Sequence, residues 1–91
     1  MSNHIQAEEG RFFIEEDGQM LAEITYRRPD QQQLLIDHTY VSETLRGQSI
    51  GEQLVRHVVD QARQENSKII PECSYAKHQF EKHPEYADVL K

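Results

Sequence analysis

Alternation of apolar and polar residues fills the first half of the chain and predicts β-strands. Three segments carry it, and we expect strands at 11–16 (RFFIEE), 19–28 (QMLAEITYRR) and 34–41 (LLIDHTYV). Asp17 and Gly18 separate the first two, and Asp-Gly between two such runs indicates a tight hairpin. In the second strand Met20, Ala22 and Ile24 occupy alternate positions, which indicates one better-buried face.

The spacing changes to a helical period near residue 50. Apolar or small residues at positions 51, 54, 55, 58, 59 and 62 form one stripe of a helix with 3.6 residues per turn. Ser49 and Glu52 match the capping box S-x-x-E, in which the hydroxyl accepts a free N–H and the carboxylate reaches back. Asn66 is a typical end signal.

A short buried strand follows at 68–73, interrupted by Pro71, and then a short terminal helix that Pro84 should end. The strand-helix-strand segment from residue 34 to residue 73 is long enough to connect parallel strands. We therefore expect an α+β fold: a small mixed, mostly antiparallel sheet with one main helix and a short C-terminal helix.

The 91 residues fit one domain, spanning 1–91, with no linker, repeat or low-complexity run. The formal net charge of −6 opposes sequence-independent binding to nucleic acid. The longest apolar runs are three residues, so we expect no membrane span, and the first ten residues do not resemble a signal peptide. With a single cysteine, which forms no internal disulfide, these features favour a cytoplasmic protein.

The segment "VSETLRGQSIGEQLV" contains residues that a capped helix does not need. Gly51 costs about 1 kcal/mol relative to Ala inside a helix, and Gly47 removes a side chain just before the cap. Small residues there let an anion reach the free N–H groups, and Arg46 adds a permanent cation. The pattern suits a phosphate or a diphosphate. The alternative is a helix start packed closely against a neighbouring strand.

This segment resembles the pyrophosphate-binding signature of the GCN5-related N-acetyltransferases: Gln or Arg, two residues, Gly, one residue, then Gly or Ala. The signature maps onto 46–51 (RGQSIG), with Ser49 in place of its first glycine. Together with "IDHTYV" and "IIPECSY", it is similar to the minimal, YjdJ-like branch of that family. The resemblance covers roughly residues 12–90.

The resemblance implies a minimal fold of that family, with the pyrophosphate of coenzyme A on the helix N-terminus and the pantetheine arm between two diverging parallel strands. Pro71 gives a physical reason for the divergence, because proline cannot donate to the ladder. The implied residues for binding the coenzyme are Thr39, Tyr40, Val41, Arg46, Gly47, Gln48, Ser49, Ile50, Gly51 and Tyr75.

The same resemblance places Cys73 beside the thioester, where its thiolate would carry the acetyl group, and makes His38 the candidate base. Without the resemblance, the alternative is that Cys73 is a small buried hydrophobic residue and that His38 simply packs on the sheet. Strand alternation puts Asp37 on the face opposite His38. Tyr75 and Tyr40 could flank the thioester, and either also fits a structural role.

Two further groups of residues carry side chains suited to a phosphate or a metal. Lys77 and His78 on the terminal helix are candidates for the adenosine phosphates, or solvent-facing residues. Cys73, His78 and His83 do not follow a familiar zinc spacing, so we expect no metal.

The sequence therefore predicts an acetyl-CoA-dependent N-acetyltransferase. The expected acceptor is an amine of a small molecule, peptide or protein, and the chain is expected as a monomer or homodimer. The alternatives are a CoA-binding regulatory or interaction module without turnover, and an interaction domain that binds no nucleotide.

Overall fold

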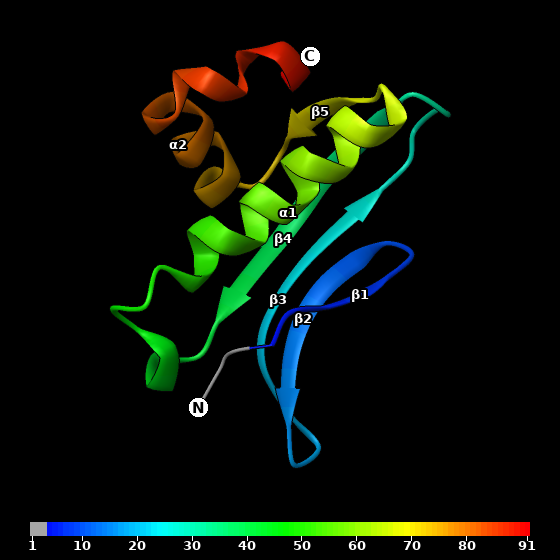
Figure 1. The fold of residues 1–91 in the computed structure, drawn as a ribbon. Helices are drawn as coiled ribbons and strands as arrows, with labels where there is room; N and C mark the ends of the chain where they lie inside the picture. Colours follow the sequence, from blue (N-terminus) through cyan, green and yellow to red (C-terminus); the bar gives the residue numbers. More distant parts are fainter. Residues whose placement is uncertain (1–3) are drawn as a thin grey trace.

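Five strands form one sheet in the order β1-β2-β3-β4-β5 in the computed structural model of the chain, which describes residues 4–91 (Figure 1). Neighbours from β1 to β4 are antiparallel, and β4 and β5 are parallel. This confirms the predicted mixed, mostly antiparallel sheet. The strands are β1 (Gln6–Glu8), β2 (Arg11–Glu16), β3 (Gln19–Arg27), β4 (Gln33–Val41) and β5 (Lys68–Pro71); the helices are η1 (Glu43–Leu45), α1 (Ile50–Glu65), α2 (Ser74–Lys82) and η2 (Pro84–Val89).

The predicted hairpin joins β2 to β3. Asp17 and Gly18 both have positive φ, at 51° and 78°, as the predicted tight turn requires. Ala22, Ile24 and Tyr26 of β3 are buried on one face, as the alternation predicts. Strand β1 was not predicted, since three partly exposed residues are too few to show a period.

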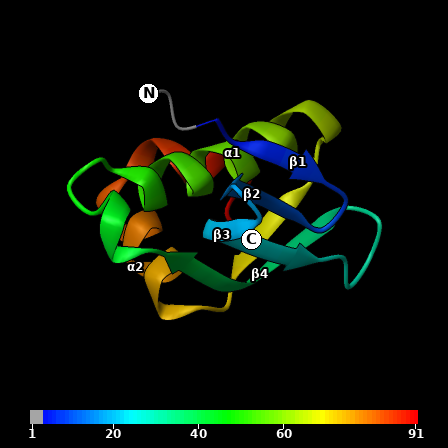
Figure 2. The same ribbon diagram turned by 90° about the horizontal axis from the view of Figure 1, so that it is seen from below.

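Helix α1 supplies the centre of the core. All six positions of the predicted apolar stripe are buried, and the helix lies across the sheet with the strands curving around it (Figure 2). Asn66 ends the helix in the left-handed conformation, with φ 58°, as predicted. The stripe therefore fixes how the helix N-terminus is held above the end of β4.

The parallel strands β4 and β5 separate near Pro71. Their last paired residues are Ile36 and Pro71, but β4 continues to Val41 (Figure 1). The carbonyl of Ile36 accepts from the N–H groups of Glu72 and Cys73, at 2.9 and 3.2 Å, as the chain turns away. The predicted divergence at Pro71 is thus present. The predicted strand is two residues too long, because Cys73 begins the next helix.

A bulge in β4 changes which side chains face the helices. Thr25 pairs with His38 while Tyr26 pairs with Ile36, so Asp37 is an extra residue. Thr39 then lies opposite the fully buried Ile24 on the helix-covered face. Simple alternation from Ile36 predicts the reverse arrangement, so the predicted opposition of Asp37 and His38 is wrong.

Helix α2 and the 3₁₀-helix η2 close the remaining side of the core. Phe80 of α2 and Tyr86 of η2 meet edge to face, with ring centroids 5.7 Å apart. Pro84 separates the two helices, as predicted, because it cannot continue α2. This packing holds the start of α2 next to the start of α1.

Candidate acyl-transfer site

The start of α1 is not capped by the predicted S-x-x-E box. Ser49 adopts a left-handed conformation, with φ 57°, and its hydroxyl makes no capping hydrogen bond. The Glu52 carboxylate instead lies 3.2 Å from Nε2 of His83 and 3.8 Å from Nζ of Lys82. Within residues 4–91, the structure gives no acceptor to the N–H groups of Ile50 and Gly51. The helix therefore presents bare donors at its positive end.

The left-handed backbone at Ser49 explains the family signature at this position. A residue with positive φ favours glycine, and the signature has glycine there. Gly47, two residues earlier, also has positive φ, at 84°, and no neighbouring atom lies within 4 Å of the place that a Cβ would take. The chain thus makes a sharp turn into α1. Ser49 adopts a left-handed backbone there, which is strained for a residue with a side chain.

Gly51 has a different role from the one the sequence suggested. A Cβ at this position would clash with the hydroxyl and with Cζ of Tyr75, the latter at 2.7 Å. The side chain is absent so that α2 can approach α1, rather than to admit an anion directly. Close packing, the alternative weighed above, accounts for Gly51; the neighbour is the tyrosine of α2 and not a strand.

Arg46 and Gln48 of the turn lie at the surface, whereas the side chain of Ile50 does not. The Arg46 side chain is 77% exposed and lies 3.8 Å from the Glu43 carboxylate. The carbonyl of Gln48 accepts from Nε2 of Gln53 at 3.2 Å. Ile50 buries its side chain in the core, so its contribution to a ligand is limited to its backbone.

The gap beyond Ile36 exposes one edge of β4. On the β3 side, Thr39, Tyr40 and Val41 are paired with β3, whereas β5 has ended on the other side. An unpaired edge offers alternating donors and acceptors to an extended amide chain. Tyr40 is 43% exposed, and Val41 packs partly against the core.

Cys73 is half-buried at the mouth of this gap. It is the N-cap of α2, and its Sγ accepts from the N–H of Ala76 at 3.3 Å. Oγ1 of Thr39, across the gap on β4, lies 3.4 Å from the same sulfur. In the contact with Thr39, either the hydroxyl or the thiol can be the donor. Two contacts therefore hold the sulfur at the mouth of the gap.

His38 does not lie beside Cys73. The bulge places it opposite Thr25, and its side chain is exposed. Asp37 is also exposed, and it accepts a hydrogen bond from Thr25. The neighbour of the sulfur on β4 is Thr39, a residue that the sequence suggested only for backbone contacts.

Tyr75 stands between the two helix starts. Its hydroxyl contacts Gly51 of α1, and it follows Cys73 by two residues. Burial raises the pKa of its hydroxyl, and the nearby Glu52 and Cys73 raise it further. The phenol therefore keeps its proton at neutral pH and is able to donate it.

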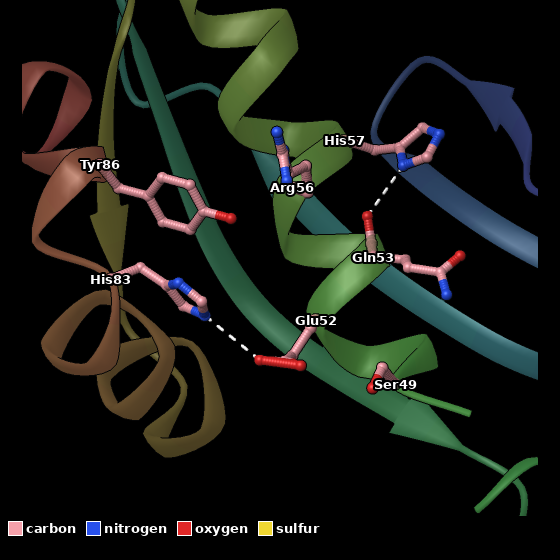
Figure 3. Close-up of a pocket in the computed structure, with 7 residues that line it drawn as sticks. All are labelled: Ser49, Glu52, Gln53, Arg56, His57, His83 and Tyr86. Atoms are coloured by element: carbon pink, nitrogen blue, oxygen red, sulfur yellow. Dashed lines mark hydrogen bonds and ion pairs between the residues drawn. The ribbon is translucent and has the colours of Figure 1, made fainter. Parts of the chain in front are cut away.

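A pocket of about 330 Å³ lies next to this site, between α1 and η2 (Figure 3). Four of its residues lie on one polar face of α1, one is the N-cap of that helix, and two come from the segment after α2. Sequence reasoning missed it, although the spacing i, i+3, i+4, i+7, i+8 along α1 is a readable signal. The lining residues are Ser49, Glu52, Gln53, Arg56, His57, His83 and Tyr86.

Two negative findings apply to the described part of the chain. Residues 4–91 contain no group of three or more His, Cys, Asp or Glu side chains arranged to hold a metal ion. Over the same residues, every helix is too short or too polar to cross a membrane.

Comparison with known proteins decides the family. The family model for GCN5-related N-acetyltransferases matches residues 11–89. The chain belongs to the GCN5-related N-acetyltransferase family. It is 47% identical to a GCN5-like candidate N-acetyltransferase from Staphylococcus aureus, with a TM-score of 0.83, covering 100% of this chain and 91% of that one. Family membership indicates an acyltransferase.

More distant structures of the family share the fold. The ribosomal-protein-S18-alanine N-acetyltransferase from Escherichia coli is 17% identical, with a TM-score of 0.62 over 85% of this chain and 53% of that one. N-acetylglutamate synthase from Neisseria gonorrhoeae, complexed with coenzyme A and N-acetyl-glutamate, is 21% identical, with a TM-score of 0.54 over 66% of this chain and 15% of that one. No curated protein matches the sequence.

Proposed function

We propose that this GCN5-related N-acetyltransferase transfers an acetyl group from acetyl-CoA to an amine. The observation that carries the proposal is the gap between β4 and β5, with Thr39 and Cys73 at its mouth and the uncapped start of α1 beside it. A diphosphate matches the uncapped start of α1, and an extended amide chain matches the free edge of β4 in the gap. Acetyl-CoA supplies the activated thioester.

The chain's residues fall into two groups in this proposal. The turn from Arg46 to Gly51 binds the diphosphate through the N–H groups of Ile50 and Gly51, with Arg46 free to swing toward it from the surface. The free edge of β4 around Thr39 and Val41 pairs with the pantetheine amides. Tyr75 stands where the two groups meet.

Cys73 is proposed as the residue that receives the acetyl group. Its sulfur would form a bond to the acyl carbon while the carbon–sulfur bond of the donor breaks. The thiol proton would reach the departing thiolate through the Tyr75 hydroxyl, which gives up its own proton and takes that of Cys73. Thr39 and the N–H of Ala76 hold the sulfur at the mouth of the gap. Tyr75 is the candidate donor of a proton to the leaving group.

The acceptor amine is proposed to approach from the open face of the sheet. His38 and Asp37 are exposed there on the same stretch of β4. His38 is thus the candidate base for the incoming amine rather than for the thiol. Because no helix among the described residues covers this face, the proposal favours a peptide or protein amine over a fully enclosed small molecule.

Thermal unfolding with coenzyme A tests the binding step. A ligand that binds only the folded state stabilises it by about 2.7 kcal/mol at a hundred times its dissociation constant, so the melting temperature should rise by several degrees. Release of free thiol from acetyl-CoA in the presence of amines then tests transfer. Ser49 in place of the signature glycine gives one specific reason to test the alternative, binding without turnover. Stabilisation with no transfer to any amine would support that alternative, and an unchanged melting temperature would exclude both.

A further inference from the structure

The pocket between α1 and η2 contains a cation without a close partner. Among residues 4–91, no hydrogen bond and no ion pair within 4.0 Å is formed by the exposed guanidinium of Arg56. The two carboxylates nearby are already engaged: Glu52 lies 3.2 Å from one ring nitrogen of His83, and Glu85 lies 3.0 Å from the other. Arg56 is therefore available to an anion.

The electrostatics of the pocket agree with this assignment. The pKa of the Glu85 carboxyl is lowered by its own backbone N–H, then by His83, and at longer range by Arg56. The buried Tyr86 presents its ring to the pocket, where Figure 3 shows it on the opposite side from His57. Arg56 is thus close enough to influence these groups without forming an ion pair with any of them.

The pocket continues from the start of α1. Ser49, at the uncapped end of the helix, also lines the pocket, and Gln53 and Arg56 follow on the same face (Figure 3). Arg56 lies six positions after Ile50, which is about 9 Å along a helix axis. Helical side chains lean back toward the N-terminus, which shortens this distance further. A ligand with a diphosphate on the N–H groups can therefore place a second phosphate at Arg56.

We propose that Arg56 binds the ribose 3′-phosphate of coenzyme A, with the adenosine lying in the pocket between α1 and η2. A guanidinium makes paired, charge-assisted hydrogen bonds to a phosphate, which gives it the required strength and geometry. This inference rests on the proposed function and names the residue by which the chain distinguishes coenzyme A from its 3′-dephospho form.

Lys77 is a second candidate cation for the phosphate and serves as a matched control. Lys77 of α2 was a candidate for the adenosine phosphates, but it lines a different pocket, with Pro71, Phe80, Glu81 and Leu90. Lys77→Gln removes the same charge as Arg56→Gln, at a position that the proposal excludes. Comparing the two variants separates a local contact from a general effect of net charge.

Titration calorimetry with coenzyme A and with 3′-dephospho-CoA tests the inference on the full chain. We expect wild type to bind coenzyme A about tenfold more tightly or better, because hydrogen bonds to a charged group are strong. Arg56→Gln should reduce this ratio to about one while keeping the affinity for dephospho-CoA, and Lys77→Gln should keep the ratio. Melting curves without ligand check that both variants fold.

Results that contradict the role of Arg56 can be told apart from results that contradict the proposed function. A wild-type ratio near one, an unchanged ratio in Arg56→Gln, or a ratio lost in Lys77→Gln would each overturn the role of Arg56 while leaving the proposed function intact. No binding of either coenzyme to wild type would overturn both.

Discussion

Oγ1 of Thr39 lies 3.4 Å from Sγ of Cys73, across the gap where β4 and β5 separate. The contact joins the strand that would bind the coenzyme to the first residue of the turn into α2. It exists because the bulge at Asp37 turns Thr39 toward the helices. Thr39 is therefore expected to position and stabilise the sulfur rather than only to offer its backbone.

Thr39→Val tests this role. The substitution keeps the shape of the side chain and removes its hydroxyl, so the rate at which Cys73 gains an acetyl group should fall by about 2–10-fold, the value of one hydrogen bond. Stopped samples analysed by mass spectrometry give the rate. Thr39→Ser is the matched control and should retain most of it. Equal rates in wild type and Thr39→Val would contradict the role.

Cys73→Ala tests the covalent step itself. Wild type incubated with acetyl-CoA and no amine should gain one acetyl group, and the variant should gain none at this site. Intact-mass measurement followed by peptide mapping provides the result. Labelling of the variant to the wild-type extent, or of wild type only on lysines, would argue for direct transfer to the amine.

Gly51→Ala tests the contact between α1 and α2. A methyl group at this position cannot coexist with the present place of the Tyr75 ring, so the ring should move. The free energy of unfolding should change little, because the helix gains about 1 kcal/mol from Ala and the phenol, 38% exposed, can rotate outward. NMR signals of the Tyr75 ring should therefore shift in this variant. Unshifted ring signals would show that the two helices are not packed as described.

Acid stability should depend on an ion pair far from the site. The guanidinium of Arg28, the residue after β3, lies 2.6 Å from the carboxylate of Glu65 in α1, and its hydrogen bonds lower the pKa of the Glu65 carboxyl to about 2. A lowered pKa stabilises the fold above the unfolded value of 4.5, and this contribution is lost as the pH falls toward 2. Both side chains are partly exposed, so we expect about 1–2 kcal/mol.

Glu65→Gln measures that contribution. Denaturant unfolding at several pH values should show wild type more stable than the variant at pH 7, with the difference shrinking between about pH 4.5 and pH 2. Glu81→Gln, an exposed glutamate on α2 whose carboxylate forms no hydrogen bond or ion pair in the described residues, is the control. A difference that does not change with pH would contradict the assignment.

The elements with a regular period could be predicted from the sequence. The stripe of α1 has six members at helical spacing, and the Asp17-Gly18 hairpin has a specific turn chemistry, so both were found correctly. The parting at Pro71 was also predictable, since proline removes a ladder donor. In each case a local rule and the global packing agree.

The errors arose where tertiary contacts override a local rule. Ser49 and Glu52 have the spacing of a capping box. The Glu52 carboxylate instead pairs with Lys82 and His83, at the end of α2. The role of Gly51 depends on Tyr75, which is 24 positions later in the chain, and no local pattern records that contact. Sequence spacing gives no information about either partner.

The bulge had the largest consequence for the candidate site. One extra residue in β4 exchanges the faces of His38 and Thr39, and strand alternation cannot detect a single insertion. The sequence therefore predicted that Cys73 lies next to this strand, as the structure shows, but it paired the sulfur with His38 instead of Thr39. The pocket around Arg56 was missed because its two halves come from α1 and η2.

The central claim is that the bare N–H groups at the start of α1 and the free edge of β4 bind one molecule of coenzyme A. Amide chemical shifts of the isotopically labelled chain, recorded while coenzyme A is added, test it most directly. We predict that the largest shifts fall on residues 39–41 and 49–51, with small changes in β1 and β2. Saturating coenzyme that left the amides of Ile50, Gly51 and Thr39 unshifted would contradict the account.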